Sequence, residues 1–468
     1  MLTYDLSQRE QLTMYEYLYK CIKKDILEGV LEGNSKLPSK REFAKQHRIS
    51  LKTVENTYEQ LLAEGYIYAK EKRGYYVVPI GGADIRRSRY ENHMPFSVYH
   101  GDISEEEYFA DFTSNQAAIK MFPYDTWAKV MRSLLSRGDA DMLRTVPYQG
   151  VYELREAIAK YLYGFRGMQV SPEQIIIGAG TEYLYGRLIQ LLGRDRVYAL
   201  EDPGYQKIAK IYRANDVSWE YIHVDENGMQ AEELYQRNAD IVHVSPAHHF
   251  PTGSIMPIAR RRQLLDWAES GRERYIVEDD YDSEFRFSRR PIPAIQSLNH
   301  NHRVIYLNTF SKTLAPAIRI SYMVLPRKLL ERYIDTMNFY SCTVSAFEQY
   351  TMAEFMMKGY FERHIHRMKN YYKGKRDCML QVLERSELKN YVTIDEKDAG
   401  NHFLMKLQTK LSDTQLKWFA REKGVKLECL SEYCINGKEL HEHTIIVNYS
   451  DLNEESFDRA LEVLMHCV

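Results

Sequence analysis

Long apolar runs, a secretory signal and clustered cysteines are all missing from this chain of 468 residues. It contains no run of about eighteen apolar residues, which excludes a typical transmembrane helix. The first residues lack the charged, apolar and small-residue regions of a secretory signal, so we expect a cytoplasmic protein. The six cysteines, at positions 21, 342, 378, 429, 434 and 467, show no metal-ligand spacing. We therefore expect reduced thiols and no metal site.

The chain also lacks an excess of charge of one sign. It contains 63 Lys and Arg and 65 Asp and Glu, which gives a net charge of −2. The chain exceeds the length that one hydrophobic core typically supports, so we expect two domains. Residues 81–109 contain glycines and several arginines but no sustained periodicity, which predicts a flexible connector. The expected organisation is a small domain over 1–80, the linker 81–109 and a large domain over 110–468.

The segment 308–319, with the sequence NTFSKTLAPAIR, carries the most informative motif. In it, Lys312 directly follows Ser311, and Arg319 comes seven residues after the lysine. A pyridoxal 5'-phosphate (PLP) site needs an amine for the aldehyde, and a hydroxyl and a guanidinium for the phosphate dianion. An ordinary surface lysine after a strand is the alternative, and other segments favour the PLP site over it.

Two segments upstream supply further parts of such a pocket. Residues 175–181 are an apolar stretch that ends in Gly180 and Thr181, before a helix-like segment. Backbone N–H groups at the start of a helix bind anions such as phosphate. Further on, Tyr205 follows a strand-end turn, where its ring can stack on a pyridine ring.

A third segment, 275–281, is an apolar strand that ends in acids. A carboxylate at Asp279 could pair with the pyridine nitrogen and keep it protonated, which makes the ring an electron sink. The alternative for Asp279 and Asp280 is a solvated acidic pair at the end of a strand. Four elements in one serial order favour the cofactor site.

With these motifs, residues from about 110 to 460 resemble the fold-type I aminotransferases of class I and II. The matching segments are 147–150, 154–155, 178–181, 202–205, 250–253, 279–281 and 311–319. The resemblance implies an α/β fold, with a large PLP-binding domain and a smaller C-terminal α/β subdomain.

The same resemblance assigns roles to individual residues. It makes Lys312 the catalytic residue that forms the Schiff base with PLP, and pairs Asp279 with the ring nitrogen. It stacks Tyr205 on the ring and places Tyr281 near the phenolic oxygen. The residues implied to hold the phosphate are Gly180, Thr181, Ser311 and Arg319.

The first eighty residues have the pattern of a small helical domain. Apolar residues at helical spacing predict a helix over 11–28. Ser39 and Ser50 are at the expected N-cap positions of a second and a third helix. Strand-like segments 66–70 and 75–78 then flank a basic turn, as in a hairpin. Three helices and a hairpin in this order predict a winged helix-turn-helix.

This segment resembles the GntR-type DNA-binding domain through residues 37–44, 50–54 and 62–65 and the basic turn. The third helix would enter the major groove through Lys52, Thr53 and Asn56, with backbone or minor-groove contacts from other residues. The expected DNA-binding residues are Ser39, Arg41, Lys52, Thr53, Asn56, Arg73 and Gly74.

Two observations qualify the prediction of DNA binding. The GntR family usually has an arginine directly after the capping serine, where this chain has Leu51, although Lys52 follows at once. Residues 1–80 hold 13 basic and 11 acidic residues, so the charge supports DNA binding only modestly. A small protein-interaction domain is the alternative.

Joined in this order, the two halves resemble the MocR/GabR-like bacterial transcriptional regulators. The resemblance implies that the chain binds operator DNA and forms a head-to-tail homodimer. It also implies that PLP senses an amine or amino acid by forming an external aldimine with it. Two alternatives stay open: a working class I/II aminotransferase with an appended DNA-binding domain, and a regulator that senses PLP itself.

The departures from the aminotransferase pattern lie at the substrate end. Aminotransferases of this fold usually hold the substrate carboxylate with an arginine near the C-terminus, but 445–452 contains none, and Asp451 aligns best. Lys207 matches an effector-binding cation of the GabR-like proteins. We therefore expect Lys207 and Asp451 to bind the effector, with a preference for a cationic or neutral distal group.

A second departure lies just before 251–253. Phe250 stands where the enzymes usually place an asparagine on the phenolic oxygen. His248 or His249 could compensate, or both could be ordinary loop residues.

Overall fold

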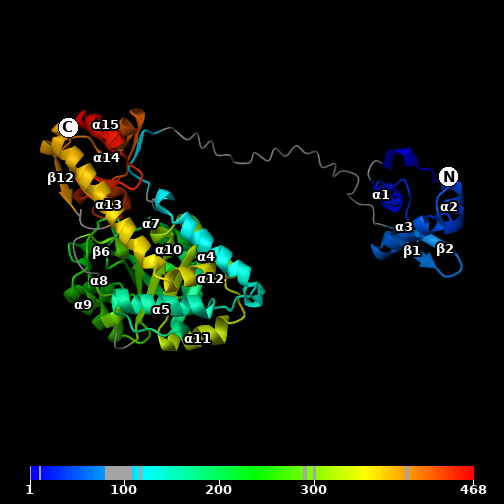
Figure 1. The fold of residues 1–468 in the computed structure, drawn as a ribbon, viewed down its shortest axis with the longest axis horizontal. Helices are drawn as coiled ribbons and strands as arrows, with labels where there is room; N and C mark the ends of the chain where they lie inside the picture. Colours follow the sequence, from blue (N-terminus) through cyan, green and yellow to red (C-terminus); the bar gives the residue numbers. More distant parts are fainter. Residues whose placement is uncertain are drawn as a thin grey trace. The chain divides into compact units, whose positions relative to one another are not determined.

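The computed structural model describes residues 2–9, 12–79, 108–114, 119–287, 292–298, 302–395 and 400–468. The chain divides into two compact units, Met1–Glu105 and Glu106–Val468. Figure 1 shows the helices and strands of each unit. The predicted linker 81–109 lies outside the described residues except for its last two positions.

The N-terminal unit is a winged helix-turn-helix, as predicted. Its elements are η1 (Leu6–Arg9), α1 (Met14–Leu27), α2 (Lys40–His47), α3 (Leu51–Ala63), β1 (Ile67–Lys70) and β2 (Gly74–Val77). Strands β1 and β2 pair antiparallel and form the wing. The Ser39 and Ser50 hydroxyls accept hydrogen bonds from the backbone N–H groups of Glu42 at 3.2 Å and Thr53 at 3.1 Å. These bonds fix where α2 and α3 begin, because they satisfy N–H groups that have no partner inside the helix.

The core of this unit comes from one face of each helix. Leu18 and Ile22 of α1 pack with Phe43 of α2 and with Val54 and Tyr58 of α3, and all five are fully buried. Since residues that share a helix face recur every three to four positions, the polar residues between them point away from this core.

An eight-stranded sheet forms the centre of the large unit, in the order β4-β11-β10-β9-β8-β5-β6-β7. In chain order the strands are β4 (Ile175–Ala179), β5 (Val197–Asp202), β6 (Ser218–Asp225), β7 (Gly228–Met229), β8 (Ile241–Val244), β9 (Tyr275–Asp280), β10 (Val304–Thr309) and β11 (Ile320–Val324). Strands β10, β9, β8, β5 and β6 run parallel, whereas β11 is antiparallel to both neighbours. The carboxyl ends of the parallel strands therefore meet at one edge, where such sheets bind ligands.

Helices cover both faces of this sheet. One face packs on α5 (Tyr152–Arg166), α8 (Ala231–Gln236), α9 (Ile258–Glu269) and α12 (Ala346–Met357). The other packs on α6 (Thr181–Leu192), α7 (Gln206–Ala214) and α11 (Arg327–Met337). Along β10, Tyr306 faces the first set and Ile305 and Leu307 face the second, as the twofold alternation of a strand requires.

A smaller subdomain completes the unit, as the resemblance implied. Strands β12 (Val392–Asp395), β13 (His402–Leu407) and β15 (Thr444–Asn448) form an antiparallel sheet. Its core packs against α13 (Tyr360–Arg385), α14 (Asp413–Glu422) and α15 (Glu454–Met465). Strand β3 (Ala110–Asp111) joins this subdomain by pairing with β14 (Val425–Lys426). Among the described residues, no helix is both long and apolar enough to cross a membrane.

Candidate cofactor site and DNA-binding surface

A cavity of about 370 Å³ opens where the parallel strands end. Most of the residues predicted for the cofactor line it, although they come from distant parts of the chain. The lining is Thr181, Glu182, Tyr185, Tyr205, Lys207, Ile208, Ser245, Phe250, Asp279, Tyr281, Thr309, Ser311, Lys312, Pro316 and Arg319.

Lys312 enters this cavity from α10 (Phe310–Thr313), the single helical turn that follows β10. The hydroxyl of Thr309 caps the turn by accepting a hydrogen bond from the Ser311 N–H at 3.2 Å. Burial lowers the pKa of the Lys312 amine to about 8, because a charged ammonium loses its hydration there. About a tenth of the amine is therefore neutral at pH 7, far more than for a solvated lysine, which suits a nucleophile for an aldehyde.

An anion site lies next to this lysine, at the N-terminus of α6. Gly180 caps the helix with φ 92°, a conformation that disfavours other residues. A Cβ at Gly180 would lie 2.2 Å from Nη2 of Arg319, so only glycine lets the guanidinium approach. The buried Ser311 hydroxyl has no hydrogen-bond partner among the described residues. An unused hydroxyl, a guanidinium and the free N–H groups of a helix start fit a phosphate group.

Asp279 is the acid of β9 that faces the cavity. Its carboxylate accepts a short hydrogen bond from the Tyr185 hydroxyl and lies 3.5 Å from Nε2 of His243. The hydroxyl of Tyr212 in turn lies 2.9 Å from Nδ1 of the same histidine. Burial raises the pKa of Tyr185 well above its usual value, so the phenol stays protonated and donates a hydrogen bond to Asp279. The carboxylate is thus held in one orientation, as pairing with a ring nitrogen would require.

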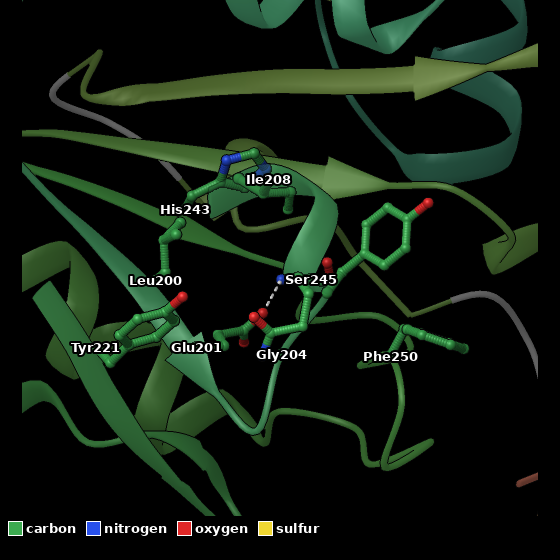
Figure 2. Close-up of a pocket in the computed structure, with 10 residues that line it drawn as sticks. Leu200, Glu201, Gly204, Ile208, Tyr221, His243, Ser245 and Phe250 are labelled. Atoms are coloured by element: carbon green, nitrogen blue, oxygen red, sulfur yellow. Dashed lines mark hydrogen bonds between the residues drawn. The ribbon is translucent and has the colours of Figure 1, made fainter. Parts of the chain in front are cut away.

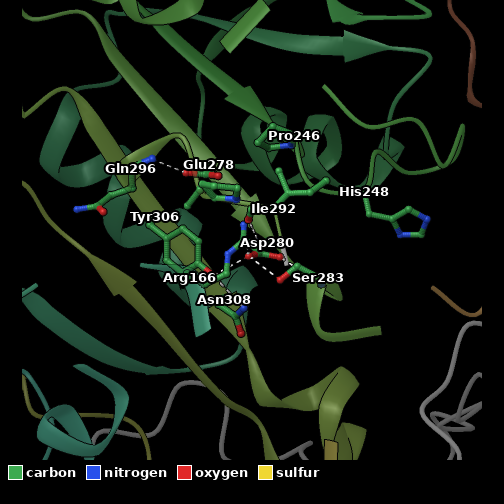
Figure 3. A network of polar contacts seen from close by, with 12 residues as sticks. Arg166, Pro246, His248, Glu278, Asp280, Ser283, Ile292, Gln296, Tyr306 and Asn308 are labelled. Carbon is green, nitrogen blue, oxygen red and sulfur yellow. Dashed lines mark hydrogen bonds and ion pairs between the residues drawn. The ribbon is translucent and has the colours of Figure 1, made fainter. Parts of the chain in front are cut away.

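Asp280, the next residue, faces the opposite side of the sheet, in the polar network of Figure 3. It pairs with Arg166 at 3.0 Å, and both side chains are 1% exposed. Tyr306 and Ser283 donate hydroxyl hydrogen bonds to it at 2.7 and 2.9 Å. Both acids are therefore buried, which rules out the solvated acidic pair that the sequence left open. Because successive residues of a strand face opposite sides, Asp279 faces the cavity and Asp280 faces the structural network.

The aromatic residues predicted to contact the PLP ring both line the cavity. Tyr205 lies at the junction of β5 and α7, with its ring edge-on to that of Phe250 at 5.7 Å. The hydroxyl of Tyr281 lies 3.2 Å from Nδ1 of His248, and burial raises the pKa of this tyrosine well above its usual value. Phe250 itself thus packs beside the expected ring position, where an asparagine would have offered a polar group.

The two histidines before Phe250 are buried rather than exposed loop residues. Nδ1 of His248 lies 2.8 Å from a carboxylate oxygen of Asp282. Nδ1 of His249 lies 2.7 Å from the Thr252 hydroxyl. Neither histidine is among the residues that line the cavity, but Tyr281, which does line it, contacts His248.

Figure 2 shows the residues around a second, water-sized cavity of about 20 Å³. It shares Tyr205, Ser245 and Phe250 with the larger cavity. Its wall includes Glu201, which accepts a hydrogen bond from the Ser245 N–H at 3.1 Å. Burial raises the pKa of this carboxyl to about 8. The sequence motif 202–205 indicated the turn but not the buried acid in front of it.

The two residues predicted for the effector occupy different environments. Lys207 lines the cavity and pairs with Glu182, which also contacts Arg319 at 2.6 Å. Asp451 is exposed, accepts a hydrogen bond from the Ser114 hydroxyl at 2.5 Å, and is not among the cavity-lining residues. Glu182 was not among the predicted site residues, although it directly follows Thr181 at the phosphate end.

The residues predicted to contact DNA gather on α2, α3 and the wing. Arg41, Lys52 and Arg73 are exposed, and Thr53 and Asn56 are partly exposed near the start of α3. Ser39 is the N-cap that precedes α2, and Gly74 is the first residue of β2. Leu51, where the family usually has an arginine, is 40% exposed on the same helix.

Comparison with known families agrees with both halves. Residues 111–464 match the aminotransferase class I and II family, and residues 14–77 match the gntR family of bacterial regulatory proteins. The first of these folds implies dependence on PLP, and the second implies DNA binding.

Whole-chain relatives and solved structures support the same assignment. The HTH-type transcriptional regulator YdeL of Bacillus subtilis is 37% identical over 90% of each chain. The probable rhizopine catabolism regulatory protein MocR of Rhizobium meliloti is 31% identical over 91% of this chain and 88% of its own. A multiple substrate aminotransferase of Thermococcus profundus superposes with a TM-score of 0.67 at 25% identity, covering 77% of this chain and 91% of its own. The chain belongs to the MocR-like HTH-type transcriptional regulators, which join a gntR-family DNA-binding domain to an aminotransferase class I and II domain.

Proposed function

We propose that this protein binds double-stranded operator DNA in the bacterial cytoplasm and senses a small amine or amino acid through PLP. The observation that carries the proposal is the combination, in one chain, of a gntR-family unit and a cavity lined by most of the residues predicted to hold PLP. In that cavity the Lys312 amine, whose pKa is lowered to about 8, shares the wall with Asp279 and Arg319.

In this proposal, each part of the cavity holds one part of the cofactor. Ser311, Arg319, Gly180 and Thr181 hold the phosphate, with the N–H of Thr181 at the start of α6 as a backbone donor and Gly180 allowing the close approach. Asp279 keeps the ring nitrogen protonated, and its bond from Tyr185 fixes its orientation. Tyr205 stacks on the ring and Tyr281 lies at the phenolic oxygen. When bound, PLP supplies an electrophilic carbon that can exchange one amine for another.

Sensing would follow from this exchange. An effector amine that takes the place of Lys312 releases a side chain that the protein had tied to its cofactor. If the two states favour different arrangements of the DNA-binding units, the effector changes DNA affinity by linkage. Transamination is not needed for this response. A head-to-tail homodimer would present two winged units to the operator and so neutralise more phosphates.

For the effector we propose a cationic or neutral group at the end away from the reacting amine. Lys207 is the cation of the cavity wall that could accept a carboxylate, but Glu182 already pairs with it. Asp451 lies outside the cavity lining and is exposed, so its negative charge would favour a cation over a carboxylate only weakly. A diamine or a basic amino acid meets these conditions.

The second candidate is a working aminotransferase, which the intact pair of Lys312 and Asp279 favours. The third is a regulator whose effector is PLP itself. Titrating fluorescent DNA from the region flanking the gene with apoprotein, with PLP-loaded protein, and with loaded protein plus amines separates these functions. A shift in DNA affinity only with amines supports the proposal, and a shift with PLP alone supports the third candidate. No DNA affinity in any state, together with rapid oxo-acid production, would establish the enzyme instead.

A further inference from the structure

Glu182 places a carboxylate between the two cations at the phosphate end of the cavity. It forms ion pairs with Lys207 and, at 2.6 Å, with Arg319. The hydrogen bond from Lys207 is the main cause that lowers the pKa of Glu182, and Arg319 adds to it. The acid is therefore ionised at neutral pH. It also lies in the first turn of α6, where the helix dipole favours a negative charge.

This carboxylate contacts the guanidinium that a phosphate would use. Arg319 packs so closely on Gly180 that a Cβ there would lie 2.2 Å from Nη2. That atom, Nη2, is also the one that contacts Glu182. A phosphate at the start of α6 and the Glu182 carboxylate therefore compete for one donor group.

The charges around the site make this competition unfavourable for a dianion. Lys207 and Arg319 contribute two positive charges, and Glu182 cancels one of them. The three side chains are 38–49% exposed, so solvent weakens the repulsion between the carboxylate and a phosphate without removing it. Lys207 is a second partner of Glu182, so the carboxylate can stay paired with Lys207 after its contact with Arg319 is broken.

We propose that Glu182 is an internal competitor for the cofactor phosphate. Its carboxylate binds both Lys207 and Arg319, and it keeps only Lys207 when a phosphate binds Arg319. The cofactor is consequently held less tightly than the cation set alone would allow, and its occupancy responds to its concentration. This inference rests on the proposed PLP site, and it adds a residue that tunes how strongly the phosphate is bound.

Replacing Glu182 by Gln tests the inference, because the amide keeps the shape of the side chain but removes its charge. The probes are pyridoxamine 5'-phosphate and pyridoxamine, which differ only in the phosphate and carry no aldehyde to react with Lys312. Dissociation constants for the full-length protein come from calorimetry or ligand fluorescence. We expect Glu182→Gln to bind pyridoxamine 5'-phosphate about tenfold more tightly, from the loss of one screened like charge, with pyridoxamine unchanged.

A matched control is Glu354→Gln. Glu354 also bridges an arginine and a lysine, Arg137 at 2.8 Å and Lys358, but it is not among the cavity-lining residues. It should leave both dissociation constants unchanged. Equal tightening for both ligands, or no tightening for the phosphorylated one, would overturn the role of Glu182. If the wild type binds neither pyridoxamine 5'-phosphate nor PLP, the proposed cofactor site itself fails, which is a different result.

Discussion

The two units of the chain offer their functional side chains in opposite ways. In the winged unit, Arg41, Lys52 and Arg73 are exposed and project from a small core. In the large unit, Asp279 and Lys312 line a cavity, and Asp279 contacts Tyr185 of α6 and His243 of β8. An exposed basic side chain acts mainly through its own charge, whereas a buried group depends on everything around it. Substitutions of exposed basic residues in the first unit should therefore have moderate effects, and substitutions of buried groups in the second unit should have larger ones.

The largest effect is expected at Lys312. The PLP-loaded protein should be yellow. Borohydride should bleach this colour and fix the cofactor onto Lys312, and Lys312→Ala should abolish the fixed adduct. Peptide mass mapping of the reduced protein identifies the labelled residue. A label on any peptide that lacks residue 312 would reject the assignment, and Lys207→Ala serves as the control because it removes the other lysine of the cavity wall.

The next largest effect is expected on the stability of the large unit, from the buried ion pair of Asp280. Asp280→Asn removes one partner of the ion pair with Arg166, in which both side chains are 1% exposed. Leaving a buried charge without its partner costs about 3–5 kcal/mol of unfolding free energy. Denaturant unfolding of the full chain measures it, in the transition that belongs to the large unit.

The winged unit supplies the comparison for this experiment. Lys23 and Glu64 pair at 2.9 Å, but both side chains are 30% exposed. Glu64→Gln should leave the unfolding of the winged unit almost unchanged, because solvent already screens the pair. If Glu64→Gln were as damaging as Asp280→Asn, burial would not be what distinguishes the two units.

On the DNA side, the expected effects are smaller and depend on the type of contact. Asn56→Ala should cost about 1–3 kcal/mol on the preferred sequence and relax base preference, since Asn56 would read a base in the major groove. Arg73→Ala should weaken binding to all sequences and reduce the salt slope by about 1, since it would neutralise a phosphate. Anisotropy titrations on specific and scrambled DNA at several salt concentrations separate the two. Unaltered sequence preference and salt slope in both variants would contradict this docking.

The sequence predicted elements and motifs well, and long-range partners poorly. Local signals are sufficient for the N-caps at Ser39 and Ser50, because the bond they make lies three residues away. The partner of Asp280 is Arg166, on a helix far away in the chain, and no local pattern announces it. Glu182 was adjacent to a predicted residue, yet its role depends on Arg319, which only the fold brings near.

Below about pH 8, the rate at which the apoprotein captures PLP should rise about tenfold for each pH unit. Lys312 must lose its proton before it attacks an aldehyde, and burial lowers its pKa to about 8. The rate at which apoprotein captures PLP should therefore rise with pH up to about 8 and level off above it, after correction for the titration of PLP with a simple amine. Stopped-flow absorbance measures the rate. A midpoint near the value of a solvated lysine, about 10.4, would show that the cavity does not perturb this amine.

The smallest effect is expected at Asp451, the residue that the sequence aligned with the carboxylate-binding arginine. Asp451 is exposed and hydrogen-bonded to Ser114, outside the cavity lining, so solvent screens its charge. Asp451→Arg should still change the relative affinity for effectors by a few-fold, in favour of acidic amino acids over diamines. The substitution replaces a negative charge by a positive one at the same position. The half-saturation of the cofactor absorbance change, measured for one diamine and one acidic amino acid, gives the ratio to compare with the wild type. Glu182→Gln is the companion variant, since it frees Lys207 inside the cavity and should favour acidic effectors more strongly. If Asp451→Arg leaves the ratio unchanged while Glu182→Gln moves it, the effector's distal charge is read at Lys207 and not at the C-terminal subdomain.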